Sequence, residues 1–210
     1  MNESLPPTPP PPDPFTPEIT TVELGSTFYR AHPSLYGATQ FNPGPRGGGR
    51  FHFFGDPIVP ALYMPTTPEA AVAETLLHEL PVGKPSRLGR DEYEYMRLST
   101  IKVNRPLQVA VFHGFGLRRL GVTANQLTDT PASRYPKTRP WAAAAHQAGA
   151  HGAVWMSRQL NSDQSFVLFG DRVAVADLEE IPSGRLPFGA GPGRDWLVDI
   201  CAPLGITVAP

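Results

Sequence analysis

Cysteine is almost absent from this sequence, because Cys201 is the only one in 210 residues. A single thiol cannot close an internal disulfide, and no cluster of cysteine and histidine has the spacing of zinc ligands. The sequence therefore excludes a disulfide framework and argues against a bound metal.

Long apolar runs are missing as well. No stretch approaches the roughly 20 consecutive apolar residues that cross a membrane. The N-terminus has neither the basic region nor the apolar segment of a signal peptide. We therefore expect a cytoplasmic protein without membrane contacts.

A basic excess is also missing. The formal net charge is -1, and Glu3, Asp13 and Glu18 are the only charged side chains in the first twenty residues, so the remainder is close to neutral. Proteins that bind nucleic acid directly usually carry a clear excess or a stripe of lysine and arginine. We expect no nucleic-acid partner, whereas a small anionic ligand is compatible with this charge.

Proline is abundant and unevenly placed. The first 17 residues hold eight of the 26 prolines and few large apolar residues. Such a segment buries little, so we expect residues 1–20 to be a disordered arm outside the fold. It is a solvated leader or, alternatively, a polyproline ligand for a partner domain. Residues 21–210 are long and apolar enough for one domain with a sizeable core.

A helix is predicted over residues 67–80. Pro68 fits its first turn behind a threonine cap, and Glu69 stands where a capping box places its acid. Apolar residues then recur on one face: Ala73, Leu76, Leu77 and Leu80. Glu74 lies at the border of this stripe and is therefore half sheltered. Such a carboxylate is either a solvated surface group or a catalytic one.

Two arginines flank a loop rich in glycine and proline. Arg30 ends one predicted strand, and the glycine triplet 47–49 leads into Arg50 and a second predicted strand over 50–54. Glycines let a backbone approach a ligand closely, and a guanidinium offers a planar donor fork suited to phosphate. Arg46, in the same loop, fits a solvated surface charge.

The rest of the chain reads as short strands with few helices. Strands are predicted over 93–103, 107–111, 152–158, 165–169 and 172–176, a helix over 138–149, and a closing helix and strand over 196–208. This pattern favours an α+β fold with two small, mostly antiparallel sheets around a cleft.

Short motifs along the chain follow the order of a known family. They are Tyr29-Arg30, Phe41-Asn42, Gly49-Arg50-Phe51, Ala61-Leu62-Tyr63, Ala73-Glu74, Thr138-Arg139, Trp141-Ala142, Trp155 with Ser157-Arg158, and Phe169-Gly170. From about Thr27 to Val175 they resemble the RES domain, named for an arginine, a glutamate and a serine. The resemblance implies an ADP-ribosyltransferase-like fold and a bacterial toxin that consumes NAD, with an Xre-type antitoxin as partner.

Carried onto this sequence, the resemblance also implies a site. The functional residues of the family fall on Arg30, Arg50, Tyr63, Glu74 and Ser157, with Tyr29 beside Arg30 as a further NAD-binding residue. Glu74, Arg30 and Ser157 are then the expected catalytic residues. The departures from the family are the proline-rich arm and a roomy stretch over 84–136, which bear on partner contacts more than on chemistry.

Those roles agree with the chemistry of the side chains. A carboxylate such as Glu74 can stabilise the oxocarbenium-like centre that forms when nicotinamide leaves ribose. Arg30 and Arg50 can hold the pyrophosphate, and Tyr63 either stacks on nicotinamide or packs in the core. Ser157 has no nucleophile-elbow motif around it, so we expect it to bond to the substrate or to be satisfied by backbone.

Three functions remain open from the sequence. The first is a toxin that cleaves NAD and passes ADP-ribose to water or to phosphate as a co-substrate, without a bound cofactor. The second is transfer of ADP-ribose to a protein. The third is a catalytically silent nucleotide-binding module.

Overall fold

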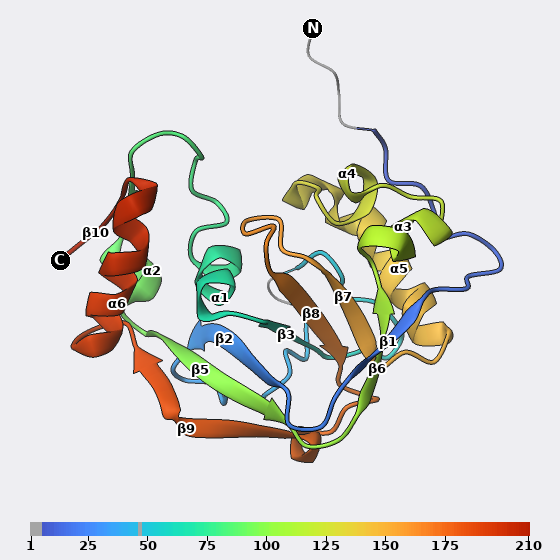
Figure 1. Ribbon diagram of the computed structural model, residues 1–210, viewed down its shortest axis with the longest axis horizontal. Coiled ribbons are helices and arrows are strands. Elements are labelled where there is room, and N and C mark those ends of the chain that lie inside the picture. The colour runs from blue at the N-terminus through green and yellow to red at the C-terminus, as the bar shows by residue number, and fades with distance from the viewer. Residues whose placement is uncertain (1–5, 46–47) are drawn as a thin grey trace, which may run out of the picture.

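The computed structural model describes residues 6–45 and 48–210, and their strands form three sheets (Figure 1). The largest sheet has the order β1-β6-β7-β8-β3. Its strands are β1 (Ile19–Val22), β6 (Leu107–Val111), β7 (Gly152–Met156), β8 (Gln164–Phe169) and β3 (Ala61–Pro65). Only the β6–β7 pair of this sheet is parallel. β3 and β1 are therefore its two edge strands.

The second sheet is antiparallel, with the order β2-β5-β9. Its strands are β2 (Thr27–Pro33), β5 (Met96–Val103) and β9 (Leu178–Pro187). A short parallel pair, β4 (Ser86–Leu88) and β10 (Ile206–Val208), forms the third sheet near the C-terminus.

Six α-helices surround the sheets in the described part of the chain. They are α1 (Pro68–Thr75), α2 (Arg90–Tyr93), α3 (Gly114–Arg119), α4 (Ala124–Leu127), α5 (Tyr135–Gln147) and α6 (Pro192–Cys201). Figure 1 shows α3, α4 and α5 at one end of the molecule and α2 and α6 at the other, with α1 between them. Among these residues no helix combines the length and the apolar character needed to cross a bilayer.

The large sheet buries both of its faces. Side chains alternate along each strand, so Trp155 and Val167 point to one side and Val154 and Leu168 to the other. The first side packs against Trp141 of α5, and the second packs against the β2-β5-β9 sheet. This arrangement confirms the predicted α+β class with small, mostly antiparallel sheets, although the described residues form three sheets where two were expected.

Several predicted elements have different bounds in the structure. The helix expected to reach Leu80 ends at Thr75, because residues 76–80 leave the helix while Leu76 and Leu77 stay buried. Residues 50–54 form a turn, an isolated bridge at His52 and an irregular segment instead of a strand. The strand predicted over 172–176 is a turn followed by a 3-10 helix, and β9 occupies residues that carry no clear strand alternation. Arg46 and Gly47 of the predicted loop lie outside the described residues.

The proline-rich arm differs most from expectation. Residues 1–5 lie outside the described part, but residues 6–17 run in an extended path beside α4 and α5. The Trp141 indole donates to the Pro9 carbonyl at 2.8 Å, and the Phe15 ring meets the Trp141 ring edge-on with centroids 6.1 Å apart. Residues 6–17 therefore pack on the domain, and the expected boundary at residue 20 falls inside β1.

Candidate active site

A cleft of about 550 Å³ runs along the edge strand β3, between the large sheet, β2 and α1. Four of the predicted site residues line it: Arg30 from β2, Arg50 from the turn after the glycine loop, Tyr63 from β3 and Glu74 from α1. These residues come from four separate segments of the chain. The fold thus gathers the predicted phosphate ligands, the aromatic ring and the carboxylate in one place.

Glu74 stands in the last turn of α1 with its carboxylate held by the segment that follows β7. Its Oε1 accepts a hydrogen bond from Ser157 Oγ at 2.5 Å and from the Arg158 backbone N–H at 2.9 Å. The Gln159 backbone N–H approaches the same oxygen at 3.4 Å. Among the described residues no donor reaches Oε2. The carboxylate is therefore oriented by one oxygen while the other remains for a ligand.

Ser157 is buried, and its hydroxyl is fully engaged within the protein. Besides donating to Glu74, its Oγ accepts the Leu160 N–H at 3.0 Å, and its own N–H donates to the Asp163 carbonyl at 2.8 Å. The serine was expected to bond to the substrate, but in the structure its hydroxyl donates its hydrogen bond to Glu74. Its geometry is that of a residue that positions the carboxylate.

Arg30 closes the loop after β2 as well as lining the cleft. Its Nη1 donates to the Ala38 carbonyl at 2.7 Å and to the Gln40 carbonyl at 2.8 Å. Burial lowers the pKa of Arg30 to about 10, which still leaves the side chain charged at neutral pH. Because these bonds use Nη1, the other N–H groups of the fork can meet an anion.

Arg50 is only 5% exposed, although it lies at the cleft wall. Its Nη1 donates to Thr130 Oγ1 at 2.5 Å and to the Thr130 carbonyl at 3.1 Å, and its guanidinium lies 5.0 Å from the centre of the Tyr135 ring. The Arg50 carbonyl accepts the Thr138 hydroxyl. Burial lowers the pKa of Arg50, and the charges of Tyr135 and Glu74 act in the opposite direction. Arg50 therefore connects the cleft to the start of α5.

Tyr63 is fixed at both its hydroxyl and its ring. The hydroxyl accepts the Phe51 N–H at 3.0 Å and bonds to His52 Nδ1 at 2.8 Å. Its ring meets Trp155 edge-on, with centroids 5.8 Å apart. Burial raises the pKa of Tyr63, so the phenol stays protonated at neutral pH. Tyr63 thus both packs against the core and presents a rigid ring to the cleft.

Tyr29 does not share the cleft with its neighbour. Successive residues of a strand point to opposite sides. Arg30 lines the cleft, whereas Tyr29 is not among its lining residues and packs against a buried core cluster that includes Val72 of α1 and Leu98 of β5. The same alternation places His32 on the side of Arg30, where it lines the cleft at 2% exposure. Burial and the charge of Arg30 lower the pKa of His32 to about 4, so the ring is neutral at pH 7.

Several other lining residues were not singled out as site residues from the sequence, among them Tyr135, Trp155 and Ser165. Trp155 belongs to a motif of the family resemblance, and its place two residues before Ser157 puts both side chains on one side of the chain. No signal marked Ser165, because a serine opening a strand is common.

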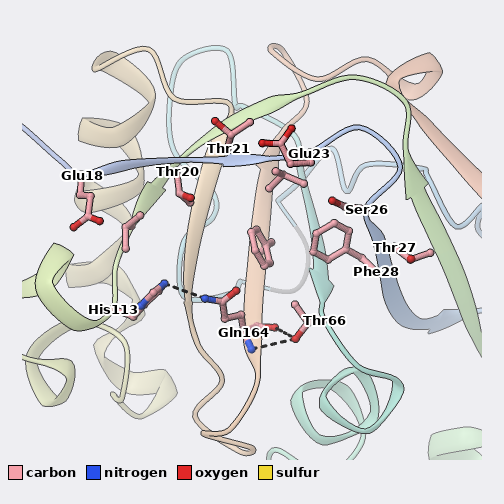
Figure 2. A pocket seen from close by; sticks show the side chains of 13 residues that line it. Glu18, Thr20, Thr21, Glu23, Ser26, Thr27, Phe28, Thr66, His113 and Gln164 are labelled. Carbon is pink, nitrogen blue, oxygen red and sulfur yellow. Dashed lines mark hydrogen bonds between the residues drawn. The ribbon is translucent and has the colours of Figure 1, made fainter.

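A second cavity, of about 510 Å³, lies beside the edge strand β1 and is also lined by residues of β2 and β8 (Figure 2). Its lining includes the carboxylates of Glu18 and Glu23, several hydroxyls, and Gln164, which bonds to His113 at 3.1 Å and to Thr66. The residues described as lining it include no lysine or arginine. An anionic ligand therefore suits the β3 cleft, with its two arginines, and not this cavity.

These features define an α+β domain whose cleft combines arginines, a rigid tyrosine and an oriented glutamate. The chain belongs to the RES family, because the RES domain model matches residues 27–189. The match reaches further than the motifs suggested and includes β9. Comparison with curated proteins finds no match.

The fold is similar to a solved structure. A chain in the crystal structure of the M. tuberculosis MbcT–MbcA toxin–antitoxin complex superimposes with a TM-score of 0.58 at 18% sequence identity. The similarity covers 79% of this chain and 85% of the other. At this identity the comparison concerns the fold.

Proposed function

We propose that this protein is an enzyme that cleaves the bond between nicotinamide and ribose in NAD. The observation that carries the proposal is Glu74, whose carboxylate is oriented by Ser157 and the Arg158 N–H at the wall of a cleft that also holds two arginines. A carboxylate held in place before the reaction stabilises developing positive charge without first having to reorganise.

The cleft offers a partner for each part of the substrate. The pyrophosphate is bound by the N–H groups of Arg30 and Arg50 that the protein does not use, in charge-assisted bonds stronger than neutral ones. The nicotinamide lies against Tyr63, whose ring is held by contacts at its hydroxyl and its edge. The ribose between them then reaches Glu74.

The reaction follows from this placement. The bond between ribose C1′ and the pyridinium nitrogen breaks, its electron pair goes to the nitrogen, and neutral nicotinamide leaves. The oxocarbenium character at C1′ is stabilised by Glu74. An oxygen of water or inorganic phosphate then bonds to C1′ and its proton goes to solvent. No general acid is required, because the leaving group loses its positive charge on departure.

Ser157 supports this step as a positioning residue. Its hydroxyl is the closest partner of Glu74 Oε1 and is itself fixed by the Leu160 N–H. Removing it would leave the carboxylate in the cleft but release its orientation.

We further propose that the protein is the toxin of a toxin–antitoxin pair, acting in the cytoplasm, where NAD is available. Membership of the RES family and the likeness to a fold found in the MbcT–MbcA toxin–antitoxin complex support this role. The partner would be an Xre-type antitoxin protein that masks the activity.

The test is to incubate the purified full chain with NAD, with and without inorganic phosphate, and to measure nicotinamide release and the adenine-containing product. We expect stoichiometric nicotinamide together with ADP-ribose, or ADP-ribose 1″-phosphate when phosphate is the acceptor. A radiolabelled protein band without free ADP-ribose would instead indicate transfer to protein. Tight NAD binding without nicotinamide release would overturn the enzymatic proposal in favour of a silent binding module.

A further inference from the structure

Two buried polar side chains on neighbouring strands line the β3 cleft. Trp155 of β7 and Ser165 of β8 stand directly opposite each other in the antiparallel pair, and both line the cleft. Trp155 is 2% exposed and Ser165 is 3% exposed. Within the described residues, neither the Trp155 indole N–H nor the Ser165 hydroxyl has a hydrogen-bond partner.

An unpaired buried donor is costly. Leaving one without a partner costs about 1–3 kcal/mol, so native proteins rarely keep two of them side by side without a reason. Trp141, in the same core cluster, shows the usual solution, because its indole N–H donates to the Pro9 carbonyl. If a bound ligand supplies their hydrogen-bond partners, this explains why Trp155 and Ser165, unlike Trp141, have none within the described protein.

The position of the pair indicates which part of the substrate it meets. The Trp155 ring contacts Tyr63, and Trp155 lies two residues before Ser157, which holds Glu74. This is the end of the cleft where the glycosidic bond would break. The pair is uncharged and buried, which suits a neutral polar group and not a phosphate.

The donors and acceptors of the pair match one such group. An indole N–H can only donate, whereas a hydroxyl can also accept. Cβ atoms of directly opposed residues in an antiparallel pair lie about 4.5–5.5 Å apart, so two atoms of one small planar group can meet both side chains. A carboxamide presents a carbonyl oxygen for the indole and an N–H for the serine.

We propose that Trp155 and Ser165 form the subsite for the carboxamide of the substrate's nicotinamide, with the indole N–H donating to its oxygen and the serine Oγ accepting from its nitrogen. This inference rests on the proposed function. It makes the two residues determinants of substrate specificity and adds an anchor that holds the leaving group beside Tyr63.

The test measures equilibrium affinity by calorimetry in the full chain carrying Glu74→Gln, so that ligand is not consumed. The ligands are NAD and its 3-acetylpyridine analogue, which keeps the carbonyl oxygen but has no N–H₂. Trp155→Phe should weaken both ligands by about 3- to 10-fold, the value of one neutral hydrogen bond. Ser165→Ala should weaken NAD by a similar factor and the analogue by less than about twofold.

The matched control is Trp141→Phe, the same exchange at an indole whose N–H is already satisfied by the arm. It should leave both affinities unchanged while lowering the melting temperature. Ser165→Ala should show the reverse, because removing a hydroxyl without a partner does not destabilise the free protein. When the same single substitutions are made in the active parent enzyme, the KM values for the two ligands should change in the same pattern.

The outcomes separate the two proposals. If the parent consumes NAD but Trp155→Phe and Ser165→Ala bind both ligands as the parent does, the subsite is wrong and the proposed function stands. Equal weakening of both ligands by Ser165→Ala would also overturn the assignment of its acceptor role. If the parent neither binds nor consumes NAD, both proposals fall together.

Discussion

The core cluster between the large sheet and α5 has a tryptophan at each end, and the two tryptophans differ in whether their indole N–H is hydrogen-bonded. Trp141 and Trp155 are both buried in that cluster, and Phe112 and Phe51 lie between them in a chain of ring contacts. The Trp141 end is covered by the arm, which supplies an acceptor for the indole N–H. The Trp155 end opens on the cleft, where the indole N–H has no acceptor among the described residues. The two indoles are therefore alike in burial, and what distinguishes them is whether the N–H has a hydrogen-bond partner among the described residues.

This contrast predicts that changes at the cleft end alter turnover with little loss of stability, and that changes at the arm end do the opposite. The largest effect is expected for Glu74→Gln. It should lower kcat for NAD by about 100-fold or more, because one preorganised electrostatic contact is lost, while NAD affinity persists through Arg30 and Arg50. Nicotinamide release and calorimetric binding measure the two quantities.

Glu79→Gln is the matched control for this variant. Glu79 is exposed, pairs only with His78 among the residues described, and lies outside α1. It should turn over NAD at the parent rate. Parent-like turnover by Glu74→Gln would show that another group meets the developing charge.

The next largest effect is expected at the arm end, for deletion of residues 1–17. The deletion removes the Phe15 contact and leaves the Trp141 N–H without its acceptor, which should cost on the order of 2 kcal/mol. In a chain of this length that corresponds to a fall of about 4–8 °C in melting temperature. Turnover at 25 °C should stay within about twofold of the parent, because no residue of the arm lines the cleft.

A calorimetric scan of the deleted and full chains decides this point. An unchanged melting temperature would mean that the arm contributes nothing to the domain in solution, and the contrast between the two ends would lose its physical basis.

The smallest effect is expected for Ser157→Ala. Loss of one orienting hydrogen bond should lower kcat by about 10-fold with little change in KM, because Glu74 keeps its charge and its bond from the Arg158 N–H. Steady-state kinetics beside Glu74→Gln give the comparison. A loss as large as that of Glu74→Gln would instead mean that Ser157 acts on the substrate itself.

Much of the fold could be predicted because its signals are local. The threonine cap, Pro68 and Glu69 define the start of α1, and alternation marks β5 and β6. The predicted end of α1 was wrong. Leu76 and Leu77 remain buried after the helix stops, so the apolar pattern extends further along the chain than the helical hydrogen bonds do. A strand such as β9, mostly exposed and containing two prolines and a glycine, gives no such signal.

The sequence predicted which residues form the site, but it did not predict the contacts between them. Arg30, Arg50, Tyr63 and Glu74 were expected together, and the cleft brings them together. The bond between Ser157 and Glu74 joins positions 83 apart in sequence, so no spacing rule could have assigned that hydroxyl. Strand alternation places Tyr29 and Arg30 on opposite sides of β2, but it does not by itself define the cleft, because Ala31 and Pro33 line it as well as Arg30 and His32.

The way the arm is held has a consequence for how its sequence can change over evolution. Within residues 6–17, two backbone carbonyls accept hydrogen bonds from the domain: that of Pro7 from Gln126 and that of Pro9 from Trp141. Every amino acid has a carbonyl, so an extended segment of quite different composition could make the same bonds. Selection can therefore preserve the contact without preserving a motif.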